Sequence, residues 1–284
     1  TGDLGFGVLD DFIRKFPNQF INAGVAEQNM TGIATGLSLD GKTVFTYSIG
    51  NFNTLRCLEQ IRNDACYHDC NLNIISVGGG FSYGALGYSH HATEDIAIMR
   101  ALPNLRVFCP SDFWEVQEIT KKVVEFGGVN YVRIDKSSSN YVNRRNEKLD
   151  IGKARILTDG KDISIIATGG IVEIALEAQK KLSKLDIFCK VVSMHTIKPI
   201  DKDIIVDVAN NTGGIITFEE HTLIGGLGGA VSEVLMQENI YPKKFKMIGL
   251  KSRFSTIVGS QSYLRNINNL DVESLICQVQ SLLK

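Results

Sequence analysis

The chain has 284 residues, enough for one large domain or two ordinary domains. Hydrophobic residues make up 44% and charged residues 21%, a balance typical of soluble globular proteins. The 30 basic and 31 acidic residues leave a net charge of −1, which argues against a nucleic-acid partner or a charged membrane surface.

The apolar runs and the cysteines indicate the cellular compartment of the protein. No apolar run reaches the ~20 residues that a membrane-spanning helix needs, so we expect no membrane insertion. The six cysteines are scattered and lie mostly in apolar runs, which favours reduced thiols in the cytoplasm over a disulfide framework. The chain begins at Thr1 without an initiator methionine or signal peptide, which is consistent with a fragment that starts within a strand.

The first half of the chain alternates short apolar runs with helical patterns, which predicts parallel strands joined by helices. Runs rich in β-branched or aromatic residues predict strands at 19–22, 44–47, 73–77, 106–109 and 129–133. Helical patterns lie between them at 31–37, 52–65, 95–101 and 114–126. Ser111 and Asp112 precede the last pattern and are typical helix N-caps.

A polar stretch then interrupts the alternation and is typical of a linker. The alternation resumes with strands predicted at 162–168, 188–193 and 214–218, and helices predicted at 172–182, 201–210 and 228–239. Alternating strands and helices favour βαβ units with right-handed crossovers. We therefore expect an α/β fold of two domains, each a largely parallel sheet flanked by helices, with domains 1–135 and 151–284 and a linker 136–150.

The first candidate site residue is Glu27, in the run GVAEQNM that opens a predicted helix rich in small residues. A carboxylate at a tightly packed helix start would be buried, which is costly for a charge that has no function. The alternative is an ordinary acidic residue that the helix dipole favours. Position alone leaves both interpretations open.

Aromatic side chains follow in the segment 44–64, which combines a predicted strand with the start of a predicted helix. Phe52 and Tyr47 are the candidates for stacking on a planar ligand through apolar burial and ring geometry. Either residue could equally be a plain core aromatic.

Histidines follow in the segment GALGYSHHATED, residues 84–95. His90 could hydrogen-bond a hydroxyl or transfer a proton, and His91 lies beside it. Adjacent histidines could also bind a metal, but their side chains diverge and no partner motif is visible. A second alternative is a zinc site at Cys66, His68 and Cys70, which lacks a second ligand pair.

The second half of the chain carries two further segments, SMHTIKPID (193–201) and FEEHTLIGGLGGAV (218–231). The glycine run could form a dinucleotide loop between a strand and a helix. That interpretation needs an acidic residue at the end of a second strand ~20 residues on, and none is clearly placed there. Close packing of a helix against a sheet is the simpler explanation of these glycines.

Taken in order, these segments resemble the motifs of transketolase-type thiamine diphosphate enzymes over essentially the whole chain. GVAEQ is similar to G-[IV]-[AR]-E-[QH], and the histidine segment is similar to G-x-T-H-Q-x-x-E-D. The two later segments are similar to T-[IV]-K-P-[LI]-D and E-E-H-x(3)-G-G-L-G. The resemblance implies a thiamine diphosphate-binding pyrimidine fold followed by a transketolase C-terminal domain.

The resemblance also implies roles for the candidate residues. Glu27 would activate the cofactor, thiamine diphosphate, through a hydrogen bond to its aminopyrimidine, and Phe52 (or Tyr47, as second choice) would pack on that ring. His90 would be catalytic and, with His91, would contact the substrate. Arg133 matches a basic position that can meet a substrate phosphate, although an exposed arginine at a strand end is the alternative.

The family's diphosphate-binding half, with its G-D-G motif and downstream Asn, is missing from this sequence. We therefore assign no metal ligands to this chain and expect Mg²⁺ to be bound mainly by a partner subunit. The resemblance implies a β-like subunit that shares the cofactor with an N-terminal, diphosphate-binding transketolase subunit, in an α2β2 heterotetramer with β–β contacts.

Transfer of a two-carbon ketol unit between sugar or sugar-phosphate substrates is the leading function that the resemblance implies. An atypical donor is expected, because the positions of the family's sugar-reading His and Asp residues are here Gly78, Gly79 and Leu86. Alternatives are a β subunit of a 2-oxo acid dehydrogenase or decarboxylase, and a condensing enzyme similar to deoxyxylulose-phosphate synthase. A non-catalytic scaffold subunit is the alternative from another class.

Overall fold

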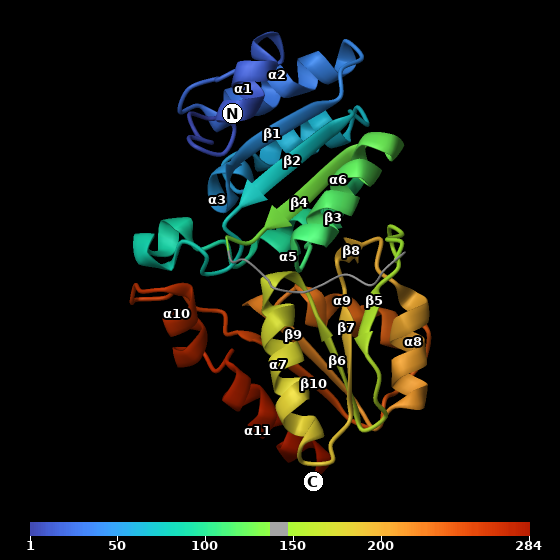
Figure 1. The fold of residues 1–284 in the computed structure, drawn as a ribbon. Coiled ribbons are helices and arrows are strands. Elements are labelled where there is room, and N and C mark those ends of the chain that lie inside the picture. The colour runs from blue at the N-terminus through green and yellow to red at the C-terminus, as the bar shows by residue number, and fades with distance from the viewer. Residues whose placement is uncertain (137–146) are drawn as a thin grey trace.

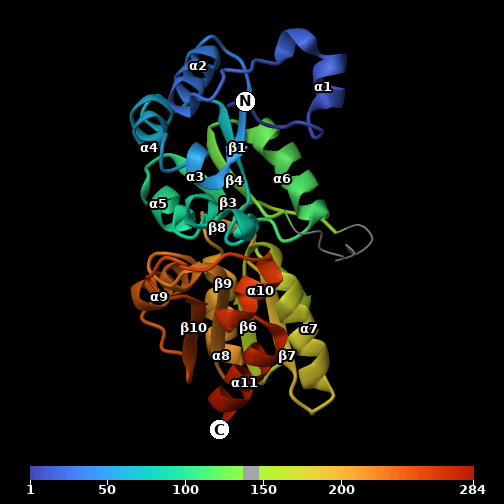
Figure 2. The same ribbon diagram turned by 90° about the vertical axis from the view of Figure 1, so that its left-hand side faces the viewer.

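The computed structural model describes residues 1–136 and 147–284, and it places them in two stacked α/β units (Figures 1 and 2). The first sheet has the order β1-β2-β4-β3-β8, with β1 to β4 parallel and β8 antiparallel to β3. Its strands are β1 (Val44–Ile49), β2 (Leu72–Val77), β3 (Leu105–Phe108), β4 (Val129–Ile134) and β8 (Thr196–Lys198).

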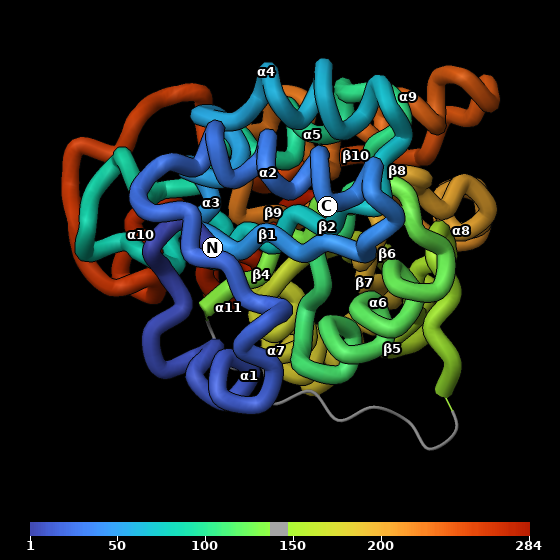
Figure 3. Tube along the Cα trace, turned by 90° about the horizontal axis from the view of Figure 1, so that it is seen from above, coloured from blue at the N-terminus to red at the C-terminus, as the bar shows by residue number. Residues whose placement is uncertain are grey.

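Helices flank the first sheet, with α2 and α4 on one side and α6 on the other (Figure 3). The α-helices of this unit are α1 (Asp10–Lys15), α2 (Glu27–Leu39), α3 (Gly50–Asn53), α4 (Leu58–Gln60), α5 (Asp95–Ala101) and α6 (Phe113–Phe126). Shorter turns are the 3₁₀ helices η1 (Pro17–Gln19), η3 (Gly84–Leu86) and η4 (Tyr88–His90), and the π-helix η2 (Ile61–Cys66).

The second sheet has the order β10-β9-β6-β7-β5, parallel except for β5. Its strands are β5 (Arg155–Thr158), β6 (Ile163–Ala167), β7 (Cys189–Ser193), β9 (Ile215–Thr222) and β10 (Phe245–Leu250). The helices of this unit are η5 (Gly169–Ile171), α7 (Val172–Ser183), α8 (Lys202–Asn211), α9 (Leu227–Gln237), α10 (Gln261–Ile267) and α11 (Val272–Leu283).

Alternate residues of the buried central strands supply the two faces of the second sheet, as parallel sheets require. On β6, Ile165 packs in the cluster formed with α7 and α11, and Ile166 packs in the cluster formed with α8 and α9. The latter cluster continues into the first unit. The two units therefore share one continuous stretch of apolar core.

The fold class predicted from the sequence is confirmed, and most predicted strands agree with the observed ones to within two residues. The predicted strand at 19–22 is wrong: Pro17 starts the 3₁₀ helix η1, and the residues after it run extended without pairing to β1. The predicted helix at 52–65 is also wrong as one element. The backbone at Thr54 does not have helical dihedral angles, so α3 ends at Asn53. The Thr54 hydroxyl donates a hydrogen bond to the Gly50 carbonyl oxygen at this end of the helix.

One strand of the second half of the chain belongs to the first sheet. β8 comes from the second half of the chain, yet it pairs with β3 in the first sheet. Of the linker predicted at 136–150, residues 137–146 lie outside the described residues. Just beyond them, Glu147 bonds to Arg155 of β5, which ties the chain to the second sheet.

Candidate active site

Glu27 is the first residue of α2 and its side chain is only 2% exposed. Arg56 donates a hydrogen bond from Nη1 to Glu27 Oε2 at 2.7 Å. Gly2 closes the other side, because a Cβ at this glycine would lie 3.0 Å from Glu27 Cγ. The burial expected for this carboxylate is confirmed, and its charge is compensated by one guanidinium and the helix N-terminus.

Arg56 connects Glu27 to the aromatic and histidine side chains. Its guanidinium carbon lies 4.8 Å from the centre of the Phe52 ring, a cation–π contact. The Phe52 ring in turn meets the His90 ring edge-on, with centroids 5.1 Å apart. The structure thus brings Glu27, Phe52 and His90 into one row and adds Arg56, which the sequence analysis missed. No local signal indicates this contact, because α3 ends at Asn53 and Arg56 lies in the turn after it.

A cleft of about 820 Å³ opens beside this row. Phe52, Arg56 and His91 line its first-unit wall, and the segment 250–257 after β10 lines the wall from the second unit. Tyr47 is not among the residues of this cleft. It lines a separate cavity of about 880 Å³ beside the edge of β1, so the geometry favours Phe52 over Tyr47 as the stacking residue.

The two histidines differ in their surroundings. His90 is partly exposed, its Nδ1 lies 3.0 Å from the Ser89 hydroxyl, and burial together with His91 lowers its pKa from 6.5. His91 is only 4% exposed, its Nε2 lies 3.2 Å from the Gly84 carbonyl oxygen, and its ring packs edge-on against Phe81. His91 therefore supports the loop, and a direct contact with substrate stays a prediction.

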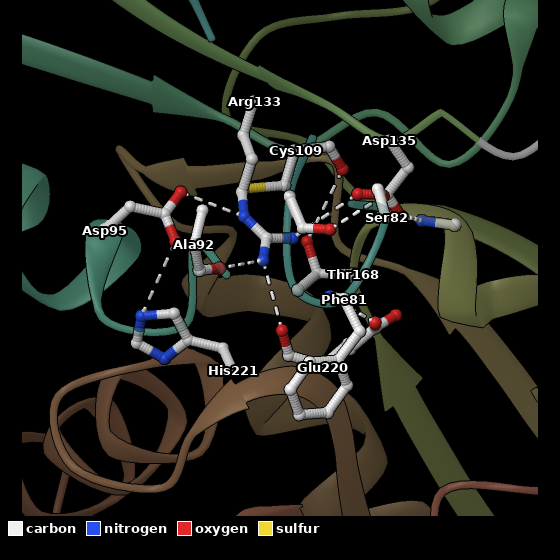
Figure 4. Close-up of polar contacts among 12 residues, drawn as sticks. Phe81, Ser82, Ala92, Asp95, Cys109, Arg133, Asp135, Thr168, Glu220 and His221 are labelled. Atoms are coloured by element: carbon white, nitrogen blue, oxygen red, sulfur yellow. Dashed lines mark hydrogen bonds and ion pairs between the residues drawn. The ribbon is translucent and has the colours of Figure 1, made fainter. Parts of the chain in front are cut away.

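Arg133 does not take the place expected of a phosphate-binding residue. Its side chain is 2% exposed, Nε donates to Asp95 at 2.9 Å, and Nη2 donates to the carbonyls of Ala92 and Glu220 (Figure 4). A guanidinium enclosed by these partners presents no face to the cleft. The expectation of an exposed arginine is therefore wrong, because Arg133 is a buried tie between the two units, whereas its contact with a substrate phosphate stays a prediction.

Two more ionisable side chains lie fully buried next to Arg133. Both oxygens of Glu219 accept backbone hydrogen bonds from the first turn of α9, yet burial raises its pKa to about 7. Burial lowers the pKa of His221 to about 4. His221 Nδ1 donates to the Thr222 carbonyl oxygen, Nε2 accepts from the Ala97 amide, and the ring nitrogen Nδ1 lies 3.7 Å from Glu219.

These two pKa shifts act on stability with opposite signs. A histidine whose folded pKa is lowered costs stability as pH falls from 6.5 to about 4, whereas a glutamate whose folded pKa is raised costs stability as pH rises from 4.5 to about 7. The prediction for the histidine follows from this sign. We expect His221→Gln to gain stability relative to the original chain as pH falls from 6.5 to 4.5, by up to about 1.4 kcal/mol per pH unit. Glu219→Gln should gain as pH rises. Urea unfolding at half-unit pH steps measures both, and parallel curves for all three proteins would contradict the assignment.

The described ranges, 1–136 and 147–284, contain neither a cluster of metal ligands nor a helix that could cross a membrane. Within them, no group of three or more His, Cys, Asp or Glu side chains is arranged to hold a metal ion. None of the helices described there combines the length and the apolar composition that crossing a bilayer requires.

Comparisons with known proteins agree with this architecture. Residues 2–140 match the family "Transketolase, pyrimidine binding domain" and residues 152–260 match "Transketolase, C-terminal domain". The "Putative transketolase C-terminal section" of Methanocaldococcus jannaschii is 40% identical over 96% of this chain and 85% of that protein. An apulose-4-phosphate transketolase subunit of Phocaeicola vulgatus is 38% identical over 88% of this chain and 80% of that protein. A solved structure, "Split gene transketolase, inactive beta4 tetramer", is 38% identical with a TM-score of 0.90, covering 100% of this chain and 90% of that one. The chain therefore belongs to the transketolase family and carries its pyrimidine-binding and C-terminal domains.

Proposed function

We propose that this chain is the β-like subunit of a thiamine diphosphate-dependent transketolase that transfers a two-carbon ketol unit between sugar-like substrates. The observation that carries the proposal is the row from buried Glu27 through Arg56 and Phe52, which both line the cleft, to the partly exposed His90. A scaffold without turnover would not need a carboxylate that is 2% exposed and paired with Arg56 of the cleft wall, together with a partly exposed histidine against the Phe52 ring.

The residues present fit the pyrimidine half of the cofactor. Glu27 would hold the aminopyrimidine by a hydrogen bond, and Phe52 offers an aromatic face beside it. When bound, the cofactor supplies an electron sink for the carbanion chemistry of ketol transfer. Arg56 donates a hydrogen bond to Glu27 Oε2. When the aminopyrimidine ring binds, Arg56 would either release this oxygen or share it with the ring. His90, at the far end of the row, would hydrogen-bond a substrate hydroxyl and hold or release a proton at its ring nitrogen.

The diphosphate half of the site has no counterpart in the described residues, which form no cluster for a metal ion. We propose that a diphosphate-binding subunit supplies Mg²⁺ binding and the rest of the site, in an α2β2 heterotetramer with β–β contacts. Relatives described as a "C-terminal section" and as one subunit of a transketolase support such a division into two chains. The free, buried cysteines Cys57, Cys66, Cys70, Cys109 and Cys189 are consistent with a cytoplasmic location.

Phosphorylated sugars are the proposed substrates. Arg56, Lys251 and Arg253 place cationic groups on the walls of the cleft, where they would attract an anionic substrate. Sugar-reading side chains have no room directly after β2: a Cβ at Gly79 would lie 2.5 Å from Asp135 Oδ1, and one at Gly78 would collide with Tyr83. This crowding supports a donor specificity different from that of ordinary transketolases, and a substrate such as apulose 4-phosphate, which appears in a relative's name, is one candidate.

Calorimetry with thiamine diphosphate and Mg²⁺ tests the proposal on this chain, on its diphosphate-binding partner, and on their complex. We expect tight binding in the complex alone, because each chain would supply one half of the site. The complex should then form a new ketose from a panel of ketose phosphates without releasing CO₂. Release of CO₂ from pyruvate would instead favour the decarboxylase or condensing-enzyme alternatives. Tight cofactor binding by this chain alone would contradict the division of the site.

A further inference from the structure

The segment that carries His90 is held from the second unit. We call residues 78–91, between β2 and the start of α5, the histidine loop. At its beginning, the Phe81 amide donates a hydrogen bond to Glu220 Oε1 at 2.7 Å, across the boundary between the units. Glu220 lies on β9, near the carboxyl end of that strand (Figure 4). The bond therefore joins the loop after β2 to the central part of the second sheet.

Glu220 is itself fixed by α10. Arg265 donates from Nε to Glu220 Oε2 at 2.6 Å, and Gln261 donates to both carboxylate oxygens at 3.1 and 3.2 Å. Gln261 also lies within 3.3 Å of the Ser82 hydroxyl, so it touches the loop as well. With only 2% of its surface exposed, this carboxylate has its charge neutralised by Arg265 and its position set from two elements.

The loop approaches Glu220 so closely that only a glycine fits at residue 80. Its φ is +59°, and a Cβ there would lie 2.6 Å from Glu220 Cδ. Two more ties follow along the loop and just beyond it: the Gly259 amide donates to the Gly84 carbonyl, and the Thr222 amide donates to the Thr93 carbonyl at 2.8 Å. The histidine loop is thus clamped to the second unit at its start, middle and end.

Packing carries this clamp to His90. The Phe81 ring, whose amide is bonded to Glu220, packs edge-on against His91 at 5.1 Å. His91 is bonded to the Gly84 carbonyl, and the next ring along the chain, His90, meets Phe52. A shift of the Phe81 amide would therefore move both histidines relative to Phe52, because closely packed rings transmit displacement.

We propose that Glu220 is a positioning residue, which holds the histidine loop from the second unit and thereby sets His90 over Phe52. Glu220 would then serve the reaction from the C-terminal half of the chain without itself touching the substrate. The catalytic meaning of this role rests on the proposed function, whereas the positional effect on His90 does not. Glu220 needs both its length, to reach the fixed Phe81 amide, and an acceptor oxygen at its end.

A pair of substitutions separates this role from a general need for charge. Glu220→Asp keeps the carboxylate for Arg265, whose side chain is flexible, but is one methylene too short to reach the Phe81 amide. Glu220→Gln keeps the reach and an acceptor oxygen but removes the charge. If Glu220 positions the loop, the aspartate variant should disturb His90 more than the glutamine variant does. If Glu220 only balances the charge of Arg265, the order should be reversed.

The first readout is the NMR titration of the ¹⁵N-labelled histidine rings in the full chain, with His90 assigned by its loss in His90→Gln. We expect Glu220→Asp to move the His90 midpoint up toward the ordinary 6.5, because a ring displaced from Phe52 loses the burial that is the larger cause of its lowered pKa. The nearby ionisable groups are His91 and Tyr83 on the loop, Lys136 above Tyr83, and Arg56 beside Phe52. All of them are unchanged in these variants, so a shift reports position.

The matched control is Glu233→Asp. Glu233 also pairs across the two units, with Arg100 on α5 at 3.0 Å, but it does not touch the histidine loop. It should leave the His90 signals in place. If thermal unfolding shows that Glu220→Asp is not folded, Gln261→Ala serves as the second variant and should give a smaller shift in the same direction.

The second readout is catalysis in the assembled enzyme. Glu220→Asp should lower kcat by about tenfold or more, since small misplacements of a reacting group cost up to about 10²-fold, while cofactor affinity stays within about twofold. Unchanged His90 signals in both Glu220→Asp and Gln261→Ala would overturn the inference, whatever the activity. A shifted His90 in a complex that neither binds cofactor nor turns over would support the positioning role and refute the proposed function instead.

Discussion

Replacing Glu27 by glutamine should reduce ketol transfer by the assembled enzyme by about 10²- to 10⁴-fold, the range typical for removing a group that handles a proton in the transition state. Glutamine has the same size and can still accept a hydrogen bond from Arg56, so the 2.7 Å contact and the start of α2 should survive. What the variant lacks is an ionisable group toward the cofactor. The loss should therefore fall on kcat, measured by steady-state formation of the ketose product, with little change in KM for the sugar acceptor.

Glu59→Gln is the control for this substitution. Glu59 is an exposed carboxylate on α4, three residues after Arg56, so the change removes the same charge close to Arg56 in the chain but from the surface, whereas Glu27 is buried. It should keep activity within about twofold. A Glu27→Gln enzyme that retains more than a third of the original kcat would refute the catalytic assignment of Glu27 and would favour the scaffold interpretation.

The regular part of the fold could be predicted because its strands are buried on both faces. Such strands are rich in apolar and β-branched residues, and this composition predicts β2, β4, β6 and β7. Strand β8 could not be recognised, because three residues gain their pairing only from β3 in the other unit. β10 was missed for another reason: it is an edge strand in which four of the six residues are only half-buried, so burial on both faces does not shape its sequence.

The position of a site residue could be predicted where a motif fixes its place on the backbone. The partner of a long side chain could not be predicted, because that partner depends on the tertiary fold. Glu27 is buried at a helix start because the run GVAEQNM places it there. Arg56 and Arg133 show the opposite case, since an arginine has a long side chain that can reach several partners. Nothing local in the sequence indicates that Arg56 reaches Glu27, 29 residues earlier, or that Arg133 turns inward to Asp95.

The boundary between the units carries buried polar groups whose partners the sequence analysis did not predict. Arg133, Glu220 and His221 come from the carboxyl ends of β4 and β9, and parallel strands bring such ends together at one edge. In many α/β folds that edge binds a ligand. Here the edges of the two sheets face each other, so their polar residues bind one another, and the ligand-sized cleft lies to one side, beside Phe52.

Arg133→Met should cost about 3–5 kcal/mol in the free energy of unfolding, because it removes one partner of a fully buried ion pair and leaves the other uncompensated. Asp95 would keep only the Tyr131 hydroxyl on its bonded oxygen, and the carbonyls of Ala92 and Glu220 would lose their donor. Arg100→Met is the matched control, since Arg100 pairs across the same boundary with the largely exposed Glu233 and should cost about 1 kcal/mol or less. Urea unfolding at pH 7 compares the two. Equal losses would mean that the boundary tolerates an unpaired Asp95, and that Arg133 is not the tie between the units that its burial and its internal bonds indicate.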